Sequence, residues 1–234
     1  MTEELDLITF DAGGTLFDMR PSRDDVFVRI LTERFEGLDR ERMVAVLRKA
    51  DRAFDQEFAL QDGKNEDPFW LKYDRFVFGE LGLKTDFPVM HKELSSAFDE
   101  IIPRVECWVE YRETKGILEG LRRRDFRLGV ISNATDLTRR VLDHLGLMKY
   151  FDFVIVSDEV GFRKPESEIF RIAGKRAKAS LNRSLHVGDK YSVDVVGARK
   201  AGMNAILVDR AGAYDDLDCV CARDLNYFSA FIRD

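Results

Sequence analysis

Five short runs rich in β-branched and aromatic residues most constrain how this chain of 234 residues can fold. From the second run onward, helical patterns of about a dozen residues separate one run from the next. This alternation predicts βαβ units and therefore an α/β fold, a doubly wound, Rossmann-like parallel sheet. The runs that we predict as buried strands are Leu5–Phe10, Arg127–Ile131, Phe153–Ser157, Ser184–Val187 and Ala205–Val208.

The helical patterns between these strands carry apolar residues at three- and four-residue spacing. Glycines stand where two of the helices should end, at Gly146 and Gly202. A proline, Pro165, is expected in the first turn of another, where its missing N–H costs nothing. The predicted helices are Tyr111–Arg124, Ala134–Leu145, Pro165–Ala177 and Ser192–Ala201.

The pattern changes between the first two predicted strands. From about residue 21 to residue 103 the sequence predicts helices and no strand. Ser22 and Asp39 are suitable helix N-caps, and Asp67 followed by Pro68 is a third. The segment is also rich in aromatic residues, a stripe that is typical of the core of a helical bundle. Its aromatic residues include Phe54, Phe58, Phe69, Trp70, Phe76, Phe78 and Phe98.

We therefore predict two domains. Residues 1–18 and 108–234 form the α/β core, and residues 19–107 form an inserted, all-helical cap domain. The chain leaves the core after the first strand and returns near Trp108, so the two linkers would act as hinges.

Composition and charge argue against several classes of protein. The net charge of −6 is opposite to that of a typical nucleic-acid binder. No apolar run approaches the ~20 residues of a membrane span, and residues 1–4 are acidic where a signal peptide is basic. Cys107, Cys219 and Cys221 form neither a disulfide ladder nor a CxxC pair. These features predict a cytoplasmic protein that binds neither nucleic acid nor membrane, and they leave its oligomeric state open.

Reactive side chains follow the predicted strands at the points where the strands end. In an open α/β sheet, ligands bind outside the carboxyl ends of the strands. The first predicted strand is followed by Asp11 and by residues 12–15. The second is followed by Ser132 and Asn133. A short loop after the third carries Lys164, and the fourth ends at Gly188-Asp189, with Asp194 five residues further on. These groups should converge on one crevice.

This set of groups suits phosphoryl transfer. Asp11 and Asp189 can hold one Mg²⁺ through carboxylate oxygens. Lys164 would neutralise the remaining charge, and Ser132 with nearby backbone amides would bind the phosphate oxygens. Asp11 would attack the phosphorus to form an aspartyl-phosphate that water then hydrolyses. The predicted function is a magnesium-dependent phosphatase acting on a small phosphorylated metabolite.

Four stretches of the sequence resemble the motifs of the haloacid dehalogenase (HAD) superfamily, in their usual order. They are LITFDAGGTLFD (Leu7–Asp18), GVISNATD (Gly129–Asp136), GFRKPESEIF (Gly161–Phe170) and HVGDKYSVDVVGARKAGM (His186–Met203). The resemblance covers the chain outside the helical insert. An insert between the first and second motifs matches the branch of the family that carries a helical cap.

The resemblance assigns roles to individual residues. It implies that Asp11 is the nucleophile and Lys164 the charge-neutralising base. Asp189 would be a metal ligand, together with the backbone carbonyl of Gly13, and Asp194 would support the metal through another ligand or through water. Ser132 would bind the phosphate. To the substrate side of the site we also assign Asn133, Gly14 and Thr15.

One position departs from the phosphatases of this family. They usually carry a second aspartate two residues after the nucleophile, as general acid and base, where this chain has Gly13. A positioned acid contributes ~10²–10⁴-fold. The substrate could have a good leaving group, a water or a cap residue could replace the acid, turnover could be weak, or the reaction could differ.

Three other functions stay open. A 2-haloacid dehalogenase shares the fold and the nucleophile, lacks the second aspartate and needs no metal, which leaves Asp189 without a purpose. A phosphonoacetaldehyde hydrolase has a small residue at the position of Gly13 but needs a cap lysine. A regulatory protein could keep the phosphate site without turnover. The available cap lysines are Lys49, Lys64, Lys72, Lys84 and Lys92.

The histidines are not expected to carry the chemistry. His186 lies inside a predicted buried strand, where a structural role is more common than a catalytic one. His91 and His144 are expected on helix surfaces. Asp194 falls in the first turns of a helix, where an acidic residue is favourable in any case.

Overall fold

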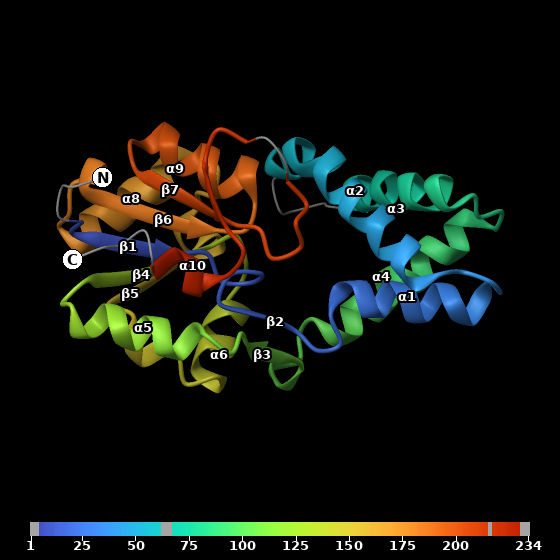
Figure 1. Cartoon of the computed structure of the whole chain (residues 1–234), viewed down its shortest axis with the longest axis horizontal. Coiled ribbons are helices and arrows are strands. Elements are labelled where there is room, and N and C mark those ends of the chain that lie inside the picture. The colour runs from blue at the N-terminus through green and yellow to red at the C-terminus, as the bar shows by residue number, and fades with distance from the viewer. Residues whose placement is uncertain (1–4, 62–66, 215–216, 230–234) are drawn as a thin grey trace. The chain divides into compact units, whose positions relative to one another are not determined.

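The computed structural model describes residues 5–61, 67–214 and 217–229. The chain divides into two compact units, residues 1–18 with 109–234 and residues 19–108. We refer to them as the core unit and the helical unit; Figure 1 labels their elements. The expected boundaries were 18/19 and 107/108. The acidic N-terminal residues 1–4 and Lys64 lie outside the described residues.

The core unit is built on a six-stranded parallel sheet with the order β5-β4-β1-β6-β7-β8. The predicted doubly wound α/β fold is confirmed. A sixth strand, β8, was missed because it has only three residues and is mostly exposed. The strands are β1 (Leu7–Phe10), β4 (Arg127–Ser132), β5 (Phe153–Val156), β6 (Ser184–Gly188), β7 (Asn204–Val208) and β8 (Val220–Ala222).

Helices cover both faces of this sheet, with α8 and α9 on one side and α5 and α6 on the other (Figure 1). The helices are α5 (Thr114–Arg123), α6 (Leu137–His144), α7 (Ser157–Val160), α8 (Ser167–Ala177), α9 (Val196–Ala201) and α10 (Leu225–Ser229). Single-turn segments η2 (Met148–Tyr150) and η3 (Leu181–Arg183) join them, and η4 (Tyr191–Val195) is a π-helical turn.

All four helices predicted between the core strands begin later than expected, α5 at Thr114 and not Tyr111, and α6 at Leu137 and not Ala134. Pro165 does not lie in the first turn of α8, since the N-cap is Glu166 and the helix begins at Ser167. The helix predicted from Ser192 begins instead as the π-helical turn η4, and α-helical geometry starts only at Val196. Its predicted end is right: Gly202 caps α9 in the left-handed conformation, with φ +93°.

The helical unit contains α1 (Arg23–Arg34), α2 (Arg40–Ala59), α3 (Asp67–Leu81) and α4 (Phe87–Ile101), followed by the short segment η1 (Val105–Cys107). Strands β2 (Phe17–Met19) and β3 (Trp108–Glu110) pair where the chain passes between the units. Ser22 caps α1 in a reciprocal capping box and Asp39 caps α2, as predicted. Asp67 is the first residue of α3, and the sequence analysis missed the N-cap of α4, Asp86.

Aromatic rings fill the core of the helical unit, as the sequence predicted. Phe69 and Phe78 are buried, and the other five predicted aromatic residues pack against the buried cluster while keeping part of their surface exposed. Phe54 of α2 contacts the rings of Phe69, Tyr73 and Phe76 of α3, with centroids 6.0, 5.7 and 5.6 Å away. Edge-on contacts of this kind add to the free energy gained from burial.

Two polar networks join the helices of this unit. Arg23 of α1 donates two hydrogen bonds to the carboxylate of Asp51 of α2, at 2.7 and 2.6 Å, and Tyr73 of α3 donates to the same carboxylate at 2.8 Å. His91 of α4 lies 2.6 Å from the buried carboxylate of Asp74. The prediction that His91 is a surface residue was therefore wrong, because Asp74 draws its ring into the helix interface. His144 is exposed, as predicted.

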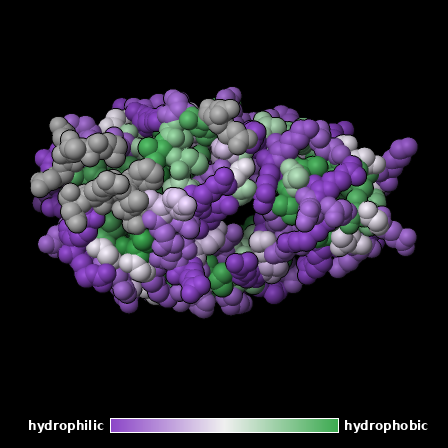
Figure 2. Space-filling model, viewed as in Figure 1, coloured by the Kyte–Doolittle hydropathy of each residue, from purple (hydrophilic) through white to green (hydrophobic). Residues whose placement is uncertain are grey.

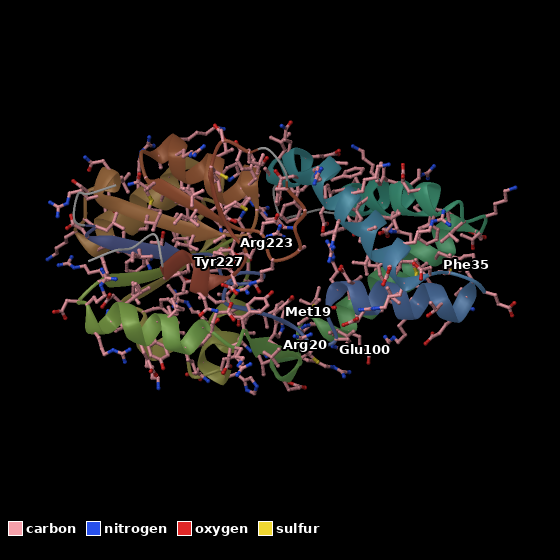
Figure 3. The ribbon with its side chains drawn as sticks, viewed as in Figure 1. Met19, Arg20, Phe35, Glu100, Arg223 and Tyr227 are labelled. Carbon is pink, nitrogen blue, oxygen red and sulfur yellow. The ribbon has the colours of Figure 1, made fainter. Side chains whose placement is uncertain are left out.

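The surface in view is mostly hydrophilic, with small scattered apolar groups (Figure 2). The large apolar side chains that are exposed are Leu60, Val89, Ile102, Val109, Phe162, Val220 and Tyr227. The labelled side chains of Figure 3 locate Arg223, directly after β8, and Tyr227 in α10.

None of the described helices is both long enough and apolar enough to cross a membrane.

Replacing Asp51 by alanine is expected to destabilise the helical unit by about 2–3 kcal/mol, because the Arg23 guanidinium and the Tyr73 hydroxyl would lose their shared acceptor. Chemical denaturation followed by circular dichroism measures the loss. The control is Glu80→Ala, which removes an exposed ion pair with Lys49. That variant should lose no more than about 1 kcal/mol. Equal losses in the two variants would contradict the prediction.

Candidate active site

The strand register brings the predicted groups to one edge of the sheet. Phe10, the last residue of β1, is aligned with Val130 of β4 and Val187 of β6. Asp11 directly follows Phe10, and Ser132 and Asp189 each lie two residues beyond the aligned positions. Because neighbouring parallel strands end on the same side, these three residues meet at the carboxyl edge of the sheet.

Lys164 lies at the centre of the site. Its ammonium donates to Asp11 at 2.5 Å and to Asp194 at 2.6 Å, and its side chain is only 1% exposed. Burial by itself would lower the pKa of Lys164, but the two carboxylates outweigh it and hold the pKa above its usual range. Lys164 is therefore a fixed positive charge. The sequence analysis placed Lys164 beside Asp11 correctly.

The site carries more negative charge than Lys164 can neutralise. Burial raises the pKa of Asp11 to about 6, against the opposing effect of Lys164. Burial also raises the pKa of Asp189 to about 8; the charge of Lys190 opposes this effect, and repulsion from Asp11 and Asp194 adds to it. Two neighbouring, partly buried carboxylates that resist ionisation are the donor set that a divalent cation stabilises.

The immediate surroundings of Asp189 also fit a cation. Within the described part of the chain, its carboxylate has no hydrogen-bond donor or ion-pair partner, and the carbonyl of Gly13 accepts no hydrogen bond. A Cβ on Gly14 would lie 2.4 Å from the Asp189 carboxylate, so Gly14 keeps this space open. The oxygens that would hold Mg²⁺ are those of Asp11, Asp189 and the Gly13 backbone. Among the described residues, no three His, Cys, Asp or Glu side chains form a metal-binding group.

The protein itself occupies both oxygens of Asp194. One accepts from Lys164 at 2.6 Å and from His186 at 3.1 Å, and the other accepts from the backbone N–H of Lys190 at 2.9 Å. Burial would raise the pKa of Asp194, but Lys164 and His186 overcome it, and the pKa is lowered. The sequence analysis assigned Asp194 to the metal; in the structure Asp194 fixes the position of Lys164.

His186 connects Asp194 to the first strand of the sheet. It is fully buried in β6, as predicted, and its other ring nitrogen lies 2.8 Å from the hydroxyl of Thr9 in β1. Burial lowers the pKa of His186 despite the neighbouring carboxylate of Asp194. A neutral ring that donates to Asp194 and accepts from Thr9 satisfies both contacts. The sequence analysis did not foresee this contact with Asp194, which depends on the geometry of η4.

The second strand of the site presents Ser132 and Asn133. The hydroxyl of Ser132 lies 3.1 Å from that of Thr138 in α6. The amide of Asn133 donates to the backbone carbonyl of Lys164 and accepts from its N–H, both at 2.7 Å. The side chain of Asn133, which we had assigned to the substrate, is therefore engaged in holding the loop of Lys164.

The loop after β1 contains the remaining predicted residues, Gly14 and Thr15. Thr15 is fully buried, and its hydroxyl has no hydrogen-bond partner among the described residues. Arg210, which the sequence analysis did not single out, donates to the carbonyls of Gly14 and Thr15 at 3.2 and 2.9 Å. Arg210 lies two residues beyond the end of β7, at the same carboxyl edge of the sheet, and that position was the available signal.

A family model described as haloacid dehalogenase-like hydrolase matches residues 5–202. The chain belongs to the haloacid dehalogenase-like hydrolases. This assignment confirms the family that the four motifs indicated. The match covers the helical unit as well as all residues of the predicted site.

Curated relatives and solved structures agree with this assignment. The chain is 30% identical to haloacid dehalogenase-like hydrolase domain-containing protein 3 of Bos taurus, over 88% of this chain and 82% of the relative. It is 32% identical to glyceraldehyde 3-phosphate phosphatase of Methanothermobacter thermautotrophicus, over 88% and 86%. A magnesium-bound HAD hydrolase of Bacillus subtilis superposes with a TM-score of 0.68 at 18% identity, covering 98% of this chain and 99% of the other. Similar folds include both phosphatases and dehalogenases, so the fold does not choose between them.

Replacing Gly14 by alanine tests the space beside Asp189. The new Cβ would overlap the carboxylate, and φ of +77° would strain the backbone. We expect Mg²⁺ to raise the melting temperature of the parent and the variant to lose this rise. Gly146→Ala is the matched control, since φ is +66° and no atom lies within 4 Å of the added Cβ. A Gly14→Ala variant that keeps the full Mg²⁺ response would contradict this geometry.

Proposed function

We propose that this hydrolase is a magnesium-dependent phosphatase that cleaves a small phosphate monoester through an aspartyl-phosphate on Asp11. The observation that carries the proposal is the partly buried carboxylate of Asp189, which lies near Asp11 and has no hydrogen-bond donor among the described residues. A relative named glyceraldehyde 3-phosphate phosphatase, matched over most of both chains, supports phosphate esters as the substrate class.

In the first step a carboxylate oxygen of Asp11 attacks the phosphorus. The Asp11–phosphorus bond forms as the bond from phosphorus to the ester oxygen breaks, and that oxygen leaves as an alkoxide that takes a proton from water. Lys164 holds Asp11 through one oxygen, which leaves the other for the attack. Mg²⁺, when bound by Asp11, Asp189 and the Gly13 carbonyl, would offset the repulsion between Asp11 and the phosphate dianion.

In the second step water hydrolyses the aspartyl-phosphate and returns Asp11 as a carboxylate. The positive charge of Lys164 stabilises the negative charge on the phosphoryl oxygens in both steps. The hydroxyls of Ser132 and Thr15 and the N–H of Thr15 are the donors that we assign to the phosphate. Gly13 has no side chain to protonate the leaving alcohol, so we expect esters of acidic alcohols to react fastest.

The alternatives fit the site less well. A 2-haloacid dehalogenase needs no metal and would give the carboxylate of Asp189 no ligand to bind. A phosphonoacetaldehyde hydrolase would need a lysine of the helical unit as its Schiff base. Two of the predicted lysines are in ion pairs, Lys49 with Glu80 and Lys72 with Glu57. A phosphate-binding protein without turnover would keep Mg²⁺ affinity but release no alcohol.

We assign the protein a small phosphorylated metabolite as substrate and neither nucleic acid nor membrane as partner. The free thiols of Cys107, Cys219 and Cys221 suit a reducing compartment, and we propose the cytoplasm.

Replacing Asp11 by asparagine should abolish turnover and leave the fold intact. The assay is release of p-nitrophenol from p-nitrophenyl phosphate with Mg²⁺ or with EDTA, and circular dichroism checks the fold. That leaving group needs little protonation, so the glycine at position 13 should not hide activity. Activity near the parent level in Asp11→Asn would remove Asp11 from the nucleophile role. If the parent itself releases nothing, 2-chloropropionate and phosphonoacetaldehyde test the alternatives.

Restoring the missing acid should accelerate the reaction of poor leaving groups. Gly13 is not among the residues with a positive φ, so an aspartate can adopt its backbone conformation. Gly13→Asp should raise kcat on alkyl phosphates by about 100-fold and leave Mg²⁺ affinity similar, because that position offers the metal its backbone. The rate with p-nitrophenyl phosphate serves as the internal control and should change far less. Alkyl phosphate turnover no faster than in the parent would contradict the role given to Gly13.

A further inference from the structure

The guanidinium of Arg210 uses all three of its nitrogens within the core unit. Nε donates to the carbonyl of Gly14 at 3.2 Å, and one terminal nitrogen donates to that of Thr15 at 2.9 Å. The other forms an ion pair with Glu113 at 2.7 Å. The flat face of the guanidinium lies 3.5 Å from the ring centre of Tyr111. Arg210 thus holds the nucleophile loop, residues 11–16, without touching Asp11.

The nucleophile loop cannot hold these two carbonyls by itself. Within the loop and its first following residue, Gly14 donates to Phe17 and Leu16 donates to Ala12, both at 2.8 Å. Neither bond uses the carbonyl of Gly14 or of Thr15. Both carbonyls accept instead from Arg210, which follows a different strand. Arg210 lies 195 residues beyond Thr15 in the sequence.

Fixing a carbonyl also fixes the N–H on the opposite side of the same planar peptide. Since Arg210 holds the carbonyl of Gly14, the N–H of Thr15 points away from the guanidinium. Within the described residues, neither this N–H nor the Thr15 hydroxyl has a protein acceptor, although Thr15 is fully buried. Buried donors normally have partners, and two free donors on one residue suit an anionic ligand such as a phosphoryl group.

We propose that Arg210 is a positioning residue for the nucleophile loop, which orients the donors of Thr15 toward the phosphate. The inference rests on the proposed phosphatase function. It requires an arginine, because the fork of the guanidinium spans two carbonyls and a carboxylate at once, whereas a lysine ammonium is a single point of contact. Glu113 and Tyr111 fix the fork from its other side.

The test compares Arg210→Ala and Arg210→Lys with the parent. The matched control is Arg199→Ala, which also removes an arginine that donates to a carbonyl and pairs with a carboxylate, both of Asp218. For each protein we would measure kcat and KM with p-nitrophenyl phosphate and Mg²⁺. Amide hydrogen exchange of residues 11–17 in the metal-free protein gives a readout that is independent of turnover. Millimolar guanidinium is then added to Arg210→Ala.

The expected result is faster exchange in residues 11–17 and a kcat about 10–100-fold lower for Arg210→Ala, with a smaller change in KM. Arg210→Lys should recover only part of the rate. Free guanidinium should restore part of the rate of Arg210→Ala and none in the control, whose exchange in this segment should match that of the parent. Rescue by the missing group is a response that a general loss of stability would not show.

Unchanged exchange in residues 11–17 would overturn the inference whatever the activity. Faster exchange with kcat within twofold of the parent would also overturn it, since the loop would then not need Arg210 for turnover, and so would a lost rate that guanidinium fails to restore. Failure of the proposed function looks different, because the parent itself would then release no p-nitrophenol before any variant is compared.

Discussion

The arrangement of the site depends on one buried ammonium group. Lys164 lies between Asp11 and Asp194, and its side chain is almost completely removed from water. A buried charge is costly unless it is paired and hydrogen-bonded, and here each partner is also held by the protein. Asp194 is held by His186 and by the N–H of Lys190, and the backbone of Lys164 is held by Asn133. The ammonium therefore has a single position from which to meet incoming negative charge.

The same interaction leaves part of the negative charge of the site unbalanced. The ammonium of Lys164 binds Asp11 and Asp194 directly, and with His186 it lowers the pKa of Asp194. The pKa of Asp189 and that of Asp11 are raised instead. An electrostatic imbalance of this kind is common at functional sites, where charge is arranged for a ligand rather than for the stability of the free protein.

Close approach of backbone and side chain is the second constraint on the site. Gly14 lies against Asp189, and Gly188 lies against Asp194, where a Cβ would come within 2.2 Å of the carboxylate carbon. At both positions a side chain would overlap a carboxylate, which is why glycine is required there. They allow acidic groups from β6 and η4 to approach the loop that follows β1. The helical unit contributes none of these contacts, and its own core is independently filled by aromatic rings.

The sequence by itself determined the sheet, the family and the residues at the strand ends. Buried strands are continuous apolar runs, and Asp11, Ser132, Lys164 and Asp189 follow them at positions that any parallel sheet brings to one edge. Such signals are local, so they can be read along the chain. Strand β8 was missed because it has only three residues and is mostly exposed, so it carries too little of that signal.

Only the tertiary structure decided which partner each polar side chain takes. Asn133 contacts the backbone of Lys164 instead of being free for the substrate, Asp194 contacts Lys164 and His186, and Arg210 reaches a loop 195 residues away. Spacing along the chain contains no information on such pairs, because they depend on η4 and on the turn after β7, whose geometry is set by packing. The sequence thus identifies the chemical groups of the site, and the fold assigns their contacts, since hydrogen bonds form between atoms that are close in space and not in sequence.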